Sequence, residues 1–342
     1  MRILVDIAHP AHVNFFKGAL HRFREEGHEV IITGLRRGKL PRILENELSQ
    51  YPVHYVGKHE GSTWSIIVEA NIKKVIRLFF FALRKKIDIG ISVGSFTMGT
   101  VLSLMGKPNL QFDDDPERHM NVLLEKLSST RLYFPPIIAP HKNVENMQAL
   151  KEWAYLAPAY FSPDASVLEP FGLQPGEYIF VREVSTGSLN YQDQEAGSVA
   201  SFARHFPQDL TVLLSLEDKE TISQYPEEWV LLQEPLPDIH SLLYYSRMIV
   251  SSGDSMAREG ALLGVPSAYV GIREMKANQL LADKNILFKQ SPAEMPHFMQ
   301  QLVEGRINVE PQEAFRSRLA DEWDDVTSFI VDATYLYASA KE

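Results

Sequence analysis

The sequence has no cysteine and no uninterrupted apolar run near the roughly 20 residues that a bilayer-spanning helix needs. Disulfides and thiolate metal sites are therefore excluded, and no transmembrane helix is expected. Positive charge is also in deficit. There are 34 Lys and Arg against 44 Asp and Glu, a formal net charge of −10, which argues against a general nucleic-acid-binding protein. No charged-then-apolar signal precedes the first apolar strand, so we expect a cytoplasmic protein.

The sequence does contain a strand–helix–strand pattern at the start of each half. Residues 1–7 predict a buried strand, residues 14–26 a helix with apolar side chains at helical spacing, and residues 28–33 a second strand. The same order begins again at residue 178. Parallel strands joined by helices are typical of a doubly wound sheet, so we predict an α/β protein with two Rossmann-like domains facing across a cleft. The expected division is an N-terminal domain at 1–158, a C-terminal domain at 159–311, and a C-terminal helix at 312–342 that packs back on the first domain.

Residues 247–266 are the stretch in which we expect the function to lie. They predict a strand, a turn at Gly253, a helix capped by Asp254 or Ser255, and a Gly-Val-Pro stop. Main-chain N–H groups at such a helix start form a natural phosphate site, and Glu259, one turn later, is placed to bind ribose hydroxyls. The alternative is a helix that is merely capped. An uncompensated carboxylate at Asp254 would repel phosphate, which Arg258 could offset.

Two segments carry a family resemblance. The opening Ile7-Ala8-His9-Pro10-Ala11-His12-Val13-Asn14-Phe15-Phe16 closely resembles the start of an uncharacterised bacterial and archaeal family of unknown function. The segment from Ser252 to Glu259, with the Gly-Val-Pro that follows it, resembles that family too. This segment is also similar to the donor-binding segment of GT-B glycosyltransferases and of non-hydrolysing UDP-N-acetylglucosamine 2-epimerases.

The resemblance implies a GT-B architecture in which the second domain holds a nucleotide-sugar donor, most simply a UDP-sugar, and the first holds the acceptor. Ser252, Gly253, Asp254 and Ser255 would then meet the diphosphate, Glu259 the ribose, and Arg182 the phosphates. Asp254 departs from the small neutral residue usual at its position. The epimerase motif His-Gly-Asp reads Val93-Gly94-Ser95 here, and His-Val-Glu-Ala-Gly falls near Gln111 to Asp115, which weighs against an epimerase.

Three residues of the first domain are candidate catalytic groups. His9 and His12 are expected in the loop after the first strand, where either is able to act as the base for an acceptor hydroxyl, with Asp6 orienting it. Alternatively, the two histidines only define the shape of that loop. Asp114 lies in the run Asp113-Asp114-Asp115, which would supply another base, an acceptor for sugar hydroxyls or an Mg²⁺ site, or else a solvated loop that caps the next helix. We expect no obligatory metal or cofactor.

The segment from Ile66 to Lys86 mixes large apolar residues with six cations inside fourteen residues. It is interpreted either as a helix that contacts a membrane surface peripherally, at the inner face, or as a sheet-covering helix with a solvated basic end. The pattern favours the second interpretation.

Together these features predict a GT-B-type glycosyltransferase that uses a nucleotide-diphosphate sugar in cell-envelope or polysaccharide synthesis, with a saccharide or lipid-linked acceptor. The alternatives are a nucleotide-sugar 2-epimerase and a non-catalytic nucleotide-sugar-binding protein.

Overall fold

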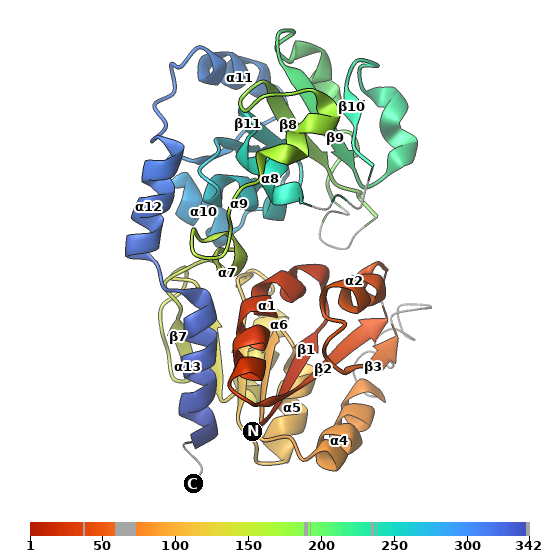
Figure 1. The fold of residues 1–342 in the computed structure, drawn as a ribbon, viewed down its shortest axis with the longest axis vertical. Coiled ribbons are helices and arrows are strands. Elements are labelled where there is room, and N and C mark those ends of the chain that lie inside the picture. The colour runs from red at the N-terminus through yellow and green to blue at the C-terminus, as the bar shows by residue number, and fades with distance from the viewer. Residues whose placement is uncertain are drawn as a thin grey trace. The chain divides into compact units, whose positions relative to one another are not determined.

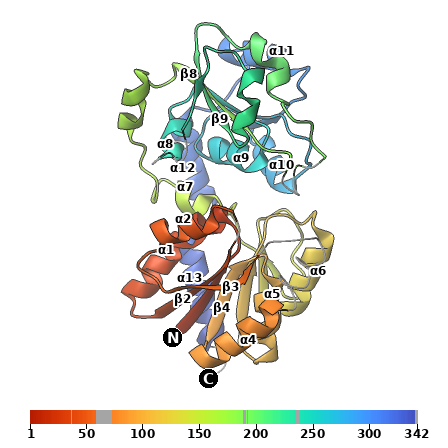
Figure 2. The same ribbon diagram turned by 90° about the vertical axis from the view of Figure 1, so that its right-hand side faces the viewer.

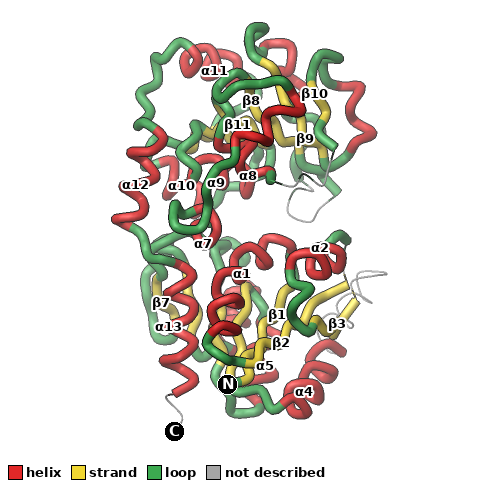
Figure 3. Tube along the Cα trace, viewed as in Figure 1, coloured by secondary structure: helices red, strands yellow, loops and turns green. Residues whose placement is uncertain are grey.

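The structure is a computed structural model that describes residues 1–36, 38–58, 73–187, 191, 193–233, 236 and 238–339. The chain divides into two compact units, the first formed by residues 1–155 and 322–342 and the second by residues 156–321 (Figure 1). Each unit is built on its own sheet, with helices covering both faces (Figure 3). In the described part of the chain, no helix is both long and apolar enough to cross a membrane.

The first unit holds a seven-stranded, wholly parallel sheet in the order β3-β2-β1-β4-β5-β6-β7. Strand β1 is buried on both faces, which explains its nearly unbroken apolar sequence. Its elements are β1 (Arg2–Ile7), α1 (Pro10–Glu25), β2 (Glu29–Arg36), α2 (Leu40–Glu47), β3 (Val53–Lys58), α4 (Lys74–Lys85), β4 (Ile89–Val93), α5 (Phe96–Leu104), β5 (Asn109–Phe112), α6 (His119–Ser128), β6 (Arg131–Phe134), β7 (Val144–Asn146), α7 (Trp153–Leu156) and, from the end of the chain, α13 (Val326–Ser339).

Helix α13 returns to the first unit and packs on α1. A Cβ atom at Gly18 of α1 would lie 2.6 Å from Oγ1 of Thr327, so only glycine allows the two helices to come this close. Arg22 also donates to Ser328 Oγ at 3.1 Å. The tail expected to pack as one helix from residue 312 is in fact two helices, because α12 (Gln312–Glu322) lies almost wholly in the second unit.

The second unit holds a six-stranded parallel sheet in the order β10-β9-β8-β11-β12-β13. The order reverses between β8 and β11, as it does between β1 and β4 in the first unit. Its elements are the 3-10 helix η2 (Ala165–Phe171), β8 (Tyr178–Glu183), η3 (Ala200–His205), β9 (Thr211–Leu216), η4 (Lys219–Gln224), β10 (Val230–Leu231), α8 (Ile239–Tyr244), β11 (Met248–Ser251), α9 (Asp254–Leu262), β12 (Ser267–Tyr269), α10 (Lys276–Ala282), β13 (Leu287–Lys289), α11 (Met295–Val303) and α12.

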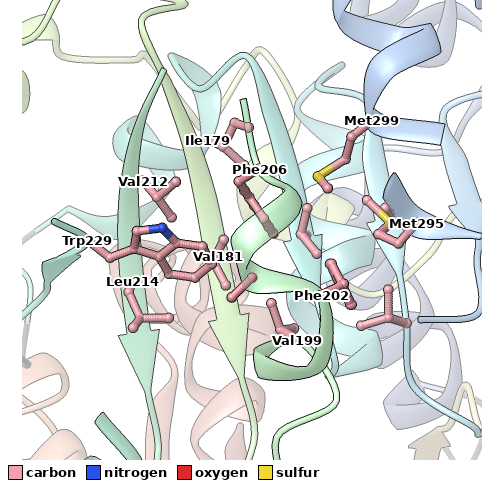
Figure 4. Close-up of a cluster of buried hydrophobic side chains, with 14 of the residues drawn as sticks. Ile179, Val181, Val199, Phe202, Phe206, Val212, Leu214, Trp229, Met295 and Met299 are labelled. Atoms are coloured by element: carbon pink, nitrogen blue, oxygen red, sulfur yellow. The ribbon is translucent and has the colours of Figure 1, made fainter. Parts of the chain in front are cut away.

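Alternate residues of the central strands build the core of the second unit. Ile179 of β8 and Val212 of β9 lie on the sheet face that η3 and α11 cover (Figure 4). Phe202 of η3 and Phe206, which follows this helix, stack with ring centroids 5.9 Å apart. Such a core holds β8 and β11 rigidly in register, which fixes the positions of the residues that follow them.

Candidate functional site

Ligands of doubly wound sheets bind beyond the carboxyl ends of the strands, near the point where the strand order reverses. In the first unit this edge carries the two histidines. Strand β1 ends at Ile7 and α1 begins at Pro10, because proline at the first helical position has a preset φ and needs no acceptor for an N–H. His9 is the N-cap, and its Nδ1 accepts from the N–H of Ala11 at 3.3 Å. The expectation that both histidines lie in a loop is therefore wrong for His12, which lies in the first turn of α1.

His12 has the environment of a neutral imidazole. Among the described residues, its buried Nδ1 has no hydrogen-bond partner. Burial lowers its pKa well below the ordinary value, and the nearby positive charges of His9 and Lys151 lower it further against the opposing charge of Asp114. The His9 and His12 ring centroids are 5.7 Å apart. The neutral imidazole keeps a lone pair that is able to accept a proton at pH 7, and its lowered pKa makes it a weaker base than an exposed histidine.

Asp6 does not orient either histidine. Its buried carboxylate accepts from Thr33 Oγ1 at 2.8 Å, from Ser95 Oγ at 2.5 Å and from Lys74 Nζ at 2.7 Å. This network ties β1 to β2 and to the starts of α4 and α5. The expected orienting role is thus replaced by a structural one, and Lys74, 4 % exposed at its side chain, is the ionic partner that the sequence did not reveal.

The three consecutive aspartates are buried, so the expected solvated loop is wrong. Asp113 Oδ1 accepts from the N–H groups of Asp114 and Asp115, and Arg118 Nη2 lies 3.1 Å from both of its oxygens. Arg118 Nε also pairs with Asp115 at 3.2 Å, and Lys151 Nζ pairs with Asp114 at 2.7 Å. Each carboxylate therefore already has a cationic partner. The described residues contain no group of three or more His, Cys, Asp or Glu arranged to hold a metal ion.

Glu125 of α6 adds a further acid next to this cluster. Burial, followed by the negative charge of Asp113, raises its pKa to about 10, so the carboxyl is protonated at neutral pH. Burial also raises the pKa of Asp113, but the Arg118 guanidinium opposes the shift. We infer that Glu125 holds the proton and Asp113 the charge, because Arg118 and two main-chain N–H groups favour the ionised form of Asp113.

In the second unit, the corner between β11 and α9 is built by two buried serines and a glycine. Ser251 Oγ donates to the carbonyl of Gly253 at 2.7 Å, and Ser252 Oγ accepts from the N–H of Val184 at 2.9 Å. Gly253 has φ −103° and ψ 135°, an extended conformation open to any residue, so it is not needed for a sharp turn. It is needed for space, because a Cβ atom there would lie 2.5 Å from Val184 Cγ1.

Gly253 is also the N-cap of α9, and no side chain caps this helix, contrary to the expectation for Asp254 or Ser255. Ser255 is exposed in the first turn. Asp254 is 2 % exposed and its carboxylate faces Arg258 Nη1 at 3.1 Å and Arg273 Nη1 at 3.5 Å, with Tyr191 donating its hydroxyl. The carboxylate is thus compensated by two guanidinium groups beside the helix N-terminus.

Glu259 and Arg182 both have ionic partners. Glu259 Oε1 lies 3.7 Å from His240 Nε2. Burial alone would lower the pKa of His240, but the hydrogen bond and charge of Glu259 outweigh it and raise that pKa. Arg182 donates to Ser215 Oγ and to Glu217 Oε1, each at 2.6 Å, so its charge is met by a carboxylate of the same unit.

The sequence predicted one of these partners, Arg258 for Asp254, but not Lys151 or Arg273, which come from distant positions. Lys151 is 37 residues from Asp114. Arg273 lies beyond β12 and reaches Asp254 only in the folded unit. A hint was present for Arg258 alone, since a residue four positions after Asp254 on a helix lies on the same face.

Comparison with known proteins shows which sequences and structures this chain resembles. Residues 1–129 match a family model described as a protein of unknown function (DUF354). An uncharacterised protein of Methanocaldococcus jannaschii is 22 % identical over 286 residues, which cover 78 % of this chain and 80 % of that protein. The crystal structure of the glycosyltransferase VinC in complex with dTDP superposes with a TM-score of 0.69 at 15 % identity, covering 99 % of this chain and 100 % of that one. The UDP-GlcNAc 2-epimerase of Neisseria meningitidis bound to UDP-GlcNAc gives 0.65 at 12 % identity, covering 98 % and 100 %.

These similarities confirm the fold class predicted from the sequence, two Rossmann-like parallel-sheet domains. The chain has the GT-B fold that glycosyltransferases and UDP-N-acetylglucosamine 2-epimerases share, and its first 129 residues match the family of unknown function DUF354.

Proposed function

We propose that this protein is a glycosyltransferase that uses a nucleotide-diphosphate sugar as donor and binds it at the start of α9. The observation that carries the proposal is the compensation of Asp254. A bare carboxylate at the first position of a helix would repel a diphosphate, but the Asp254 carboxylate lies beside the guanidinium groups of Arg258 and Arg273. The N–H groups of the first helical turn have no intrahelical acceptor, so together with the two guanidinium groups they offer a phosphate both charge and directed donors.

The donor contacts are assigned by asking which polar groups are bonded within the protein and which face solvent. Ser252 is buried and its hydroxyl oxygen accepts from Val184, so we assign it to holding the corner. The diphosphate is assigned to the main-chain N–H groups from Gly253 onward and to the exposed hydroxyl of Ser255. Glu259 is assigned to the ribose hydroxyls. Arg182, which also bonds to Ser215 and Glu217, remains a proposed phosphate contact.

The base in this proposal is His12. It would take the proton of an acceptor hydroxyl while that oxygen bonds to the anomeric carbon of the donor sugar. The bond from that carbon to the diphosphate breaks, and the diphosphate leaves with the electron pair, stabilised by the start of α9. His12 is preferred over His9, which caps α1, and over Asp114, whose carboxylate is paired with Lys151.

The acceptor in this proposal is a saccharide or a lipid-linked hydroxyl compound of cell-envelope or polysaccharide synthesis, and no metal is required. UDP and dTDP sugars are the first donors to test, because the two similar structures hold dTDP and UDP-GlcNAc.

A thermal-shift screen against UDP-, dTDP-, GDP- and CMP-sugars tests the donor site. A ligand that binds only the folded state raises the melting temperature with its saturation. We expect one nucleotide class to stabilise the protein, and no stabilisation by any class would overturn the donor assignment.

Replacing His12 by Gln then tests the base. We expect turnover to fall by about 10² to 10⁴-fold with donor affinity retained, since positioned bases contribute about that much. Asp114→Asn is the matched control and should lose less. Unchanged turnover in His12→Gln would remove His12 as the base.

A nucleotide-sugar 2-epimerase is the second candidate, because the similarity to the Neisseria meningitidis epimerase spans the whole chain at a TM-score close to that of the transferase. An epimerase converts its substrate with no acceptor present. NMR of the stabilising nucleotide sugar incubated with the protein alone separates the two: a new sugar configuration identifies an epimerase, and an unchanged donor favours the transferase. A protein that binds donor but never turns it over would be a non-catalytic binding protein.

A further inference from the structure

Three helices of the first unit form one outer layer with an unusual surface. Helix α5 packs between α4 and α6 on the same face of the sheet (Figure 2). Residues 66–72 of the basic segment lie outside the described residues, but α4 itself is described. Seven of the twelve large apolar side chains that are exposed in the described part of the chain lie on this layer: Ile76, Phe80, Leu83, Leu104, Met120, Leu123 and Leu127.

The exposed apolar residues follow helical spacing, so they form stripes. On α4, Ile76, Phe80 and Leu83 share one face, while Leu78 and Ala82 of the opposite face are fully buried against the sheet. The stripe on α6 is Met120, Leu123 and Leu127. A helix that only covers a sheet has an apolar inner face and a polar outer face. Both helices here have apolar outer faces as well, and contiguous exposed apolar surface marks an interaction site.

The charge of the layer indicates what it binds. Residues 73–107, which include α4 and α5 but not α6, contain seven Lys and Arg, of which Lys74 is buried against Asp6, and one acidic residue, Asp88, in a chain whose net charge is −10. Lys73, Arg77, Arg84 and Lys86 are exposed on or beside α4, so cations are interleaved with the apolar stripe. Apolar side chains among cations match a phospholipid surface, where acyl chains lie beneath anionic headgroups. A second copy of the chain fits less well, because a symmetric contact would place like charges face to face.

We propose that the outer face of α4, α5 and α6 is a docking surface for an anionic membrane. Phe80, Leu83 and Leu127 insert among the headgroups, and Arg77 and Arg84 pair with the anionic lipids. In this proposal α4 combines the two interpretations of its sequence, since its inner face covers the sheet and its outer face meets the membrane.

Co-sedimentation of the full-length protein with vesicles tests this surface without any nucleotide sugar, so its outcome is independent of the proposed function. We expect binding to phosphatidylcholine vesicles that contain phosphatidylglycerol, weakened by added salt, and little binding to phosphatidylcholine alone. The double variant Arg77→Gln/Arg84→Gln should bind about 30-fold more weakly, because each cation near an anionic surface contributes about 1 kcal/mol.

Matched variants elsewhere on the molecule act as controls. Arg204→Gln/Arg306→Gln removes the same charge from exposed positions of the second unit and should bind as the wild type does. Phe80→Ser/Leu127→Ser should reduce binding several-fold, whereas Ile272→Ser/Leu336→Ser, which alters two other exposed apolar residues, should not. All four variants should unfold at the wild-type temperature, because the altered side chains are exposed.

Three results would overturn the proposal. One is the absence of binding to the anionic vesicles. Another is binding that the layer variants and their controls weaken equally. The third is a wild-type dimer in solution that Phe80→Ser/Leu127→Ser dissociates, since a second copy would then cover the layer.

Discussion

Placing a negative charge at residue 255 separates phosphate binding from helix stability. Ser255 is exposed in the first turn of α9, so Glu fits there without repacking. A carboxylate near a helix N-terminus stabilises the helix by about 0.3 to 1 kcal/mol. The same carboxylate would repel a diphosphate bound to the N–H groups of that turn. Ser255→Glu should therefore raise the stability of the free protein slightly and weaken the binding of donor.

The size of the binding loss follows from the distance across one helical turn. Two like charges about 6 Å apart repel by about 0.7 kcal/mol in bulk water and by about 3 kcal/mol at an effective dielectric constant of 20. The corner is partly shielded from water, because Gly253 and Asp254 are buried, so the loss should lie inside this range. We expect the Kd for the donor to rise by about 3- to 150-fold.

Isothermal titration calorimetry with the nucleotide sugar that the screen identifies measures this loss, and urea denaturation measures the stability. Ala293→Glu is the control, because it adds the same charge at an exposed position beside the start of α11. It should leave the Kd unchanged. Equal affinity in wild type and Ser255→Glu, with the stability raised, would refute the assignment of the diphosphate to α9.

Three further predictions concern groups whose environment the structure defines. Gly253→Ala should destabilise the fold by about 1 to 3 kcal/mol in urea denaturation, because the new Cβ atom would meet Val184. Adding Val184→Ala should recover most of this loss. A wild-type denaturation midpoint for Gly253→Ala alone would contradict this close packing. The NMR titration midpoint of His240 should lie above its ordinary value of 6.5 and should fall in Glu259→Gln. The His240–Glu259 pair stabilises the fold fully below pH 6.5, and this stabilisation is lost as the pH rises through the raised pKa. A midpoint that Glu259→Gln leaves unchanged would exclude the interaction between the two side chains. Glu125, with a pKa raised from 4.5 to about 10, stays protonated in the folded protein but ionises in the unfolded chain. Between pH 4.5 and 7, the free energy of unfolding of the wild type should therefore fall by about 3 kcal/mol relative to that of Glu125→Gln. Parallel profiles of stability against pH for the two proteins would disprove the raised pKa.

The fold could be predicted from the sequence because its determinants are local and repeated. Strands β1 and β11 are buried on both faces, so their apolar runs are continuous, and the helices that follow them have apolar residues at helical spacing. Two strand–helix–strand openings in one chain then require two parallel sheets. Helix α1 begins at Pro10, four residues before the predicted start at residue 14, because proline is favoured at a first helical position.

The chemistry of the candidate site was less predictable because it depends on contacts between distant residues. The run of three aspartates looks the same in sequence whether it faces water, a metal or cations. Only the fold brings Lys151 to Asp114 across 37 residues, whereas Arg118 pairs with Asp113 and Asp115 from the same loop. Gly253 is a similar case. A glycine at a strand–helix corner suggests a special backbone angle, whereas its actual role is to leave room for Val184.

The two sheets have the same strand order at their reversal points, but the buried carboxylates there have different partners. At the carboxyl end of β1, the buried carboxylate of Asp6 receives one cation and two hydroxyls, so the corner is neutral and closed. After β11, the buried carboxylate of Asp254 faces two guanidinium groups, so the corresponding corner offers two arginine side chains beside a helix N-terminus. Guanidinium groups form strong, charge-assisted hydrogen bonds with phosphate oxygens. This difference is the physical reason to assign the anionic donor to the second unit and to seek the proton-accepting group, His12, in the first.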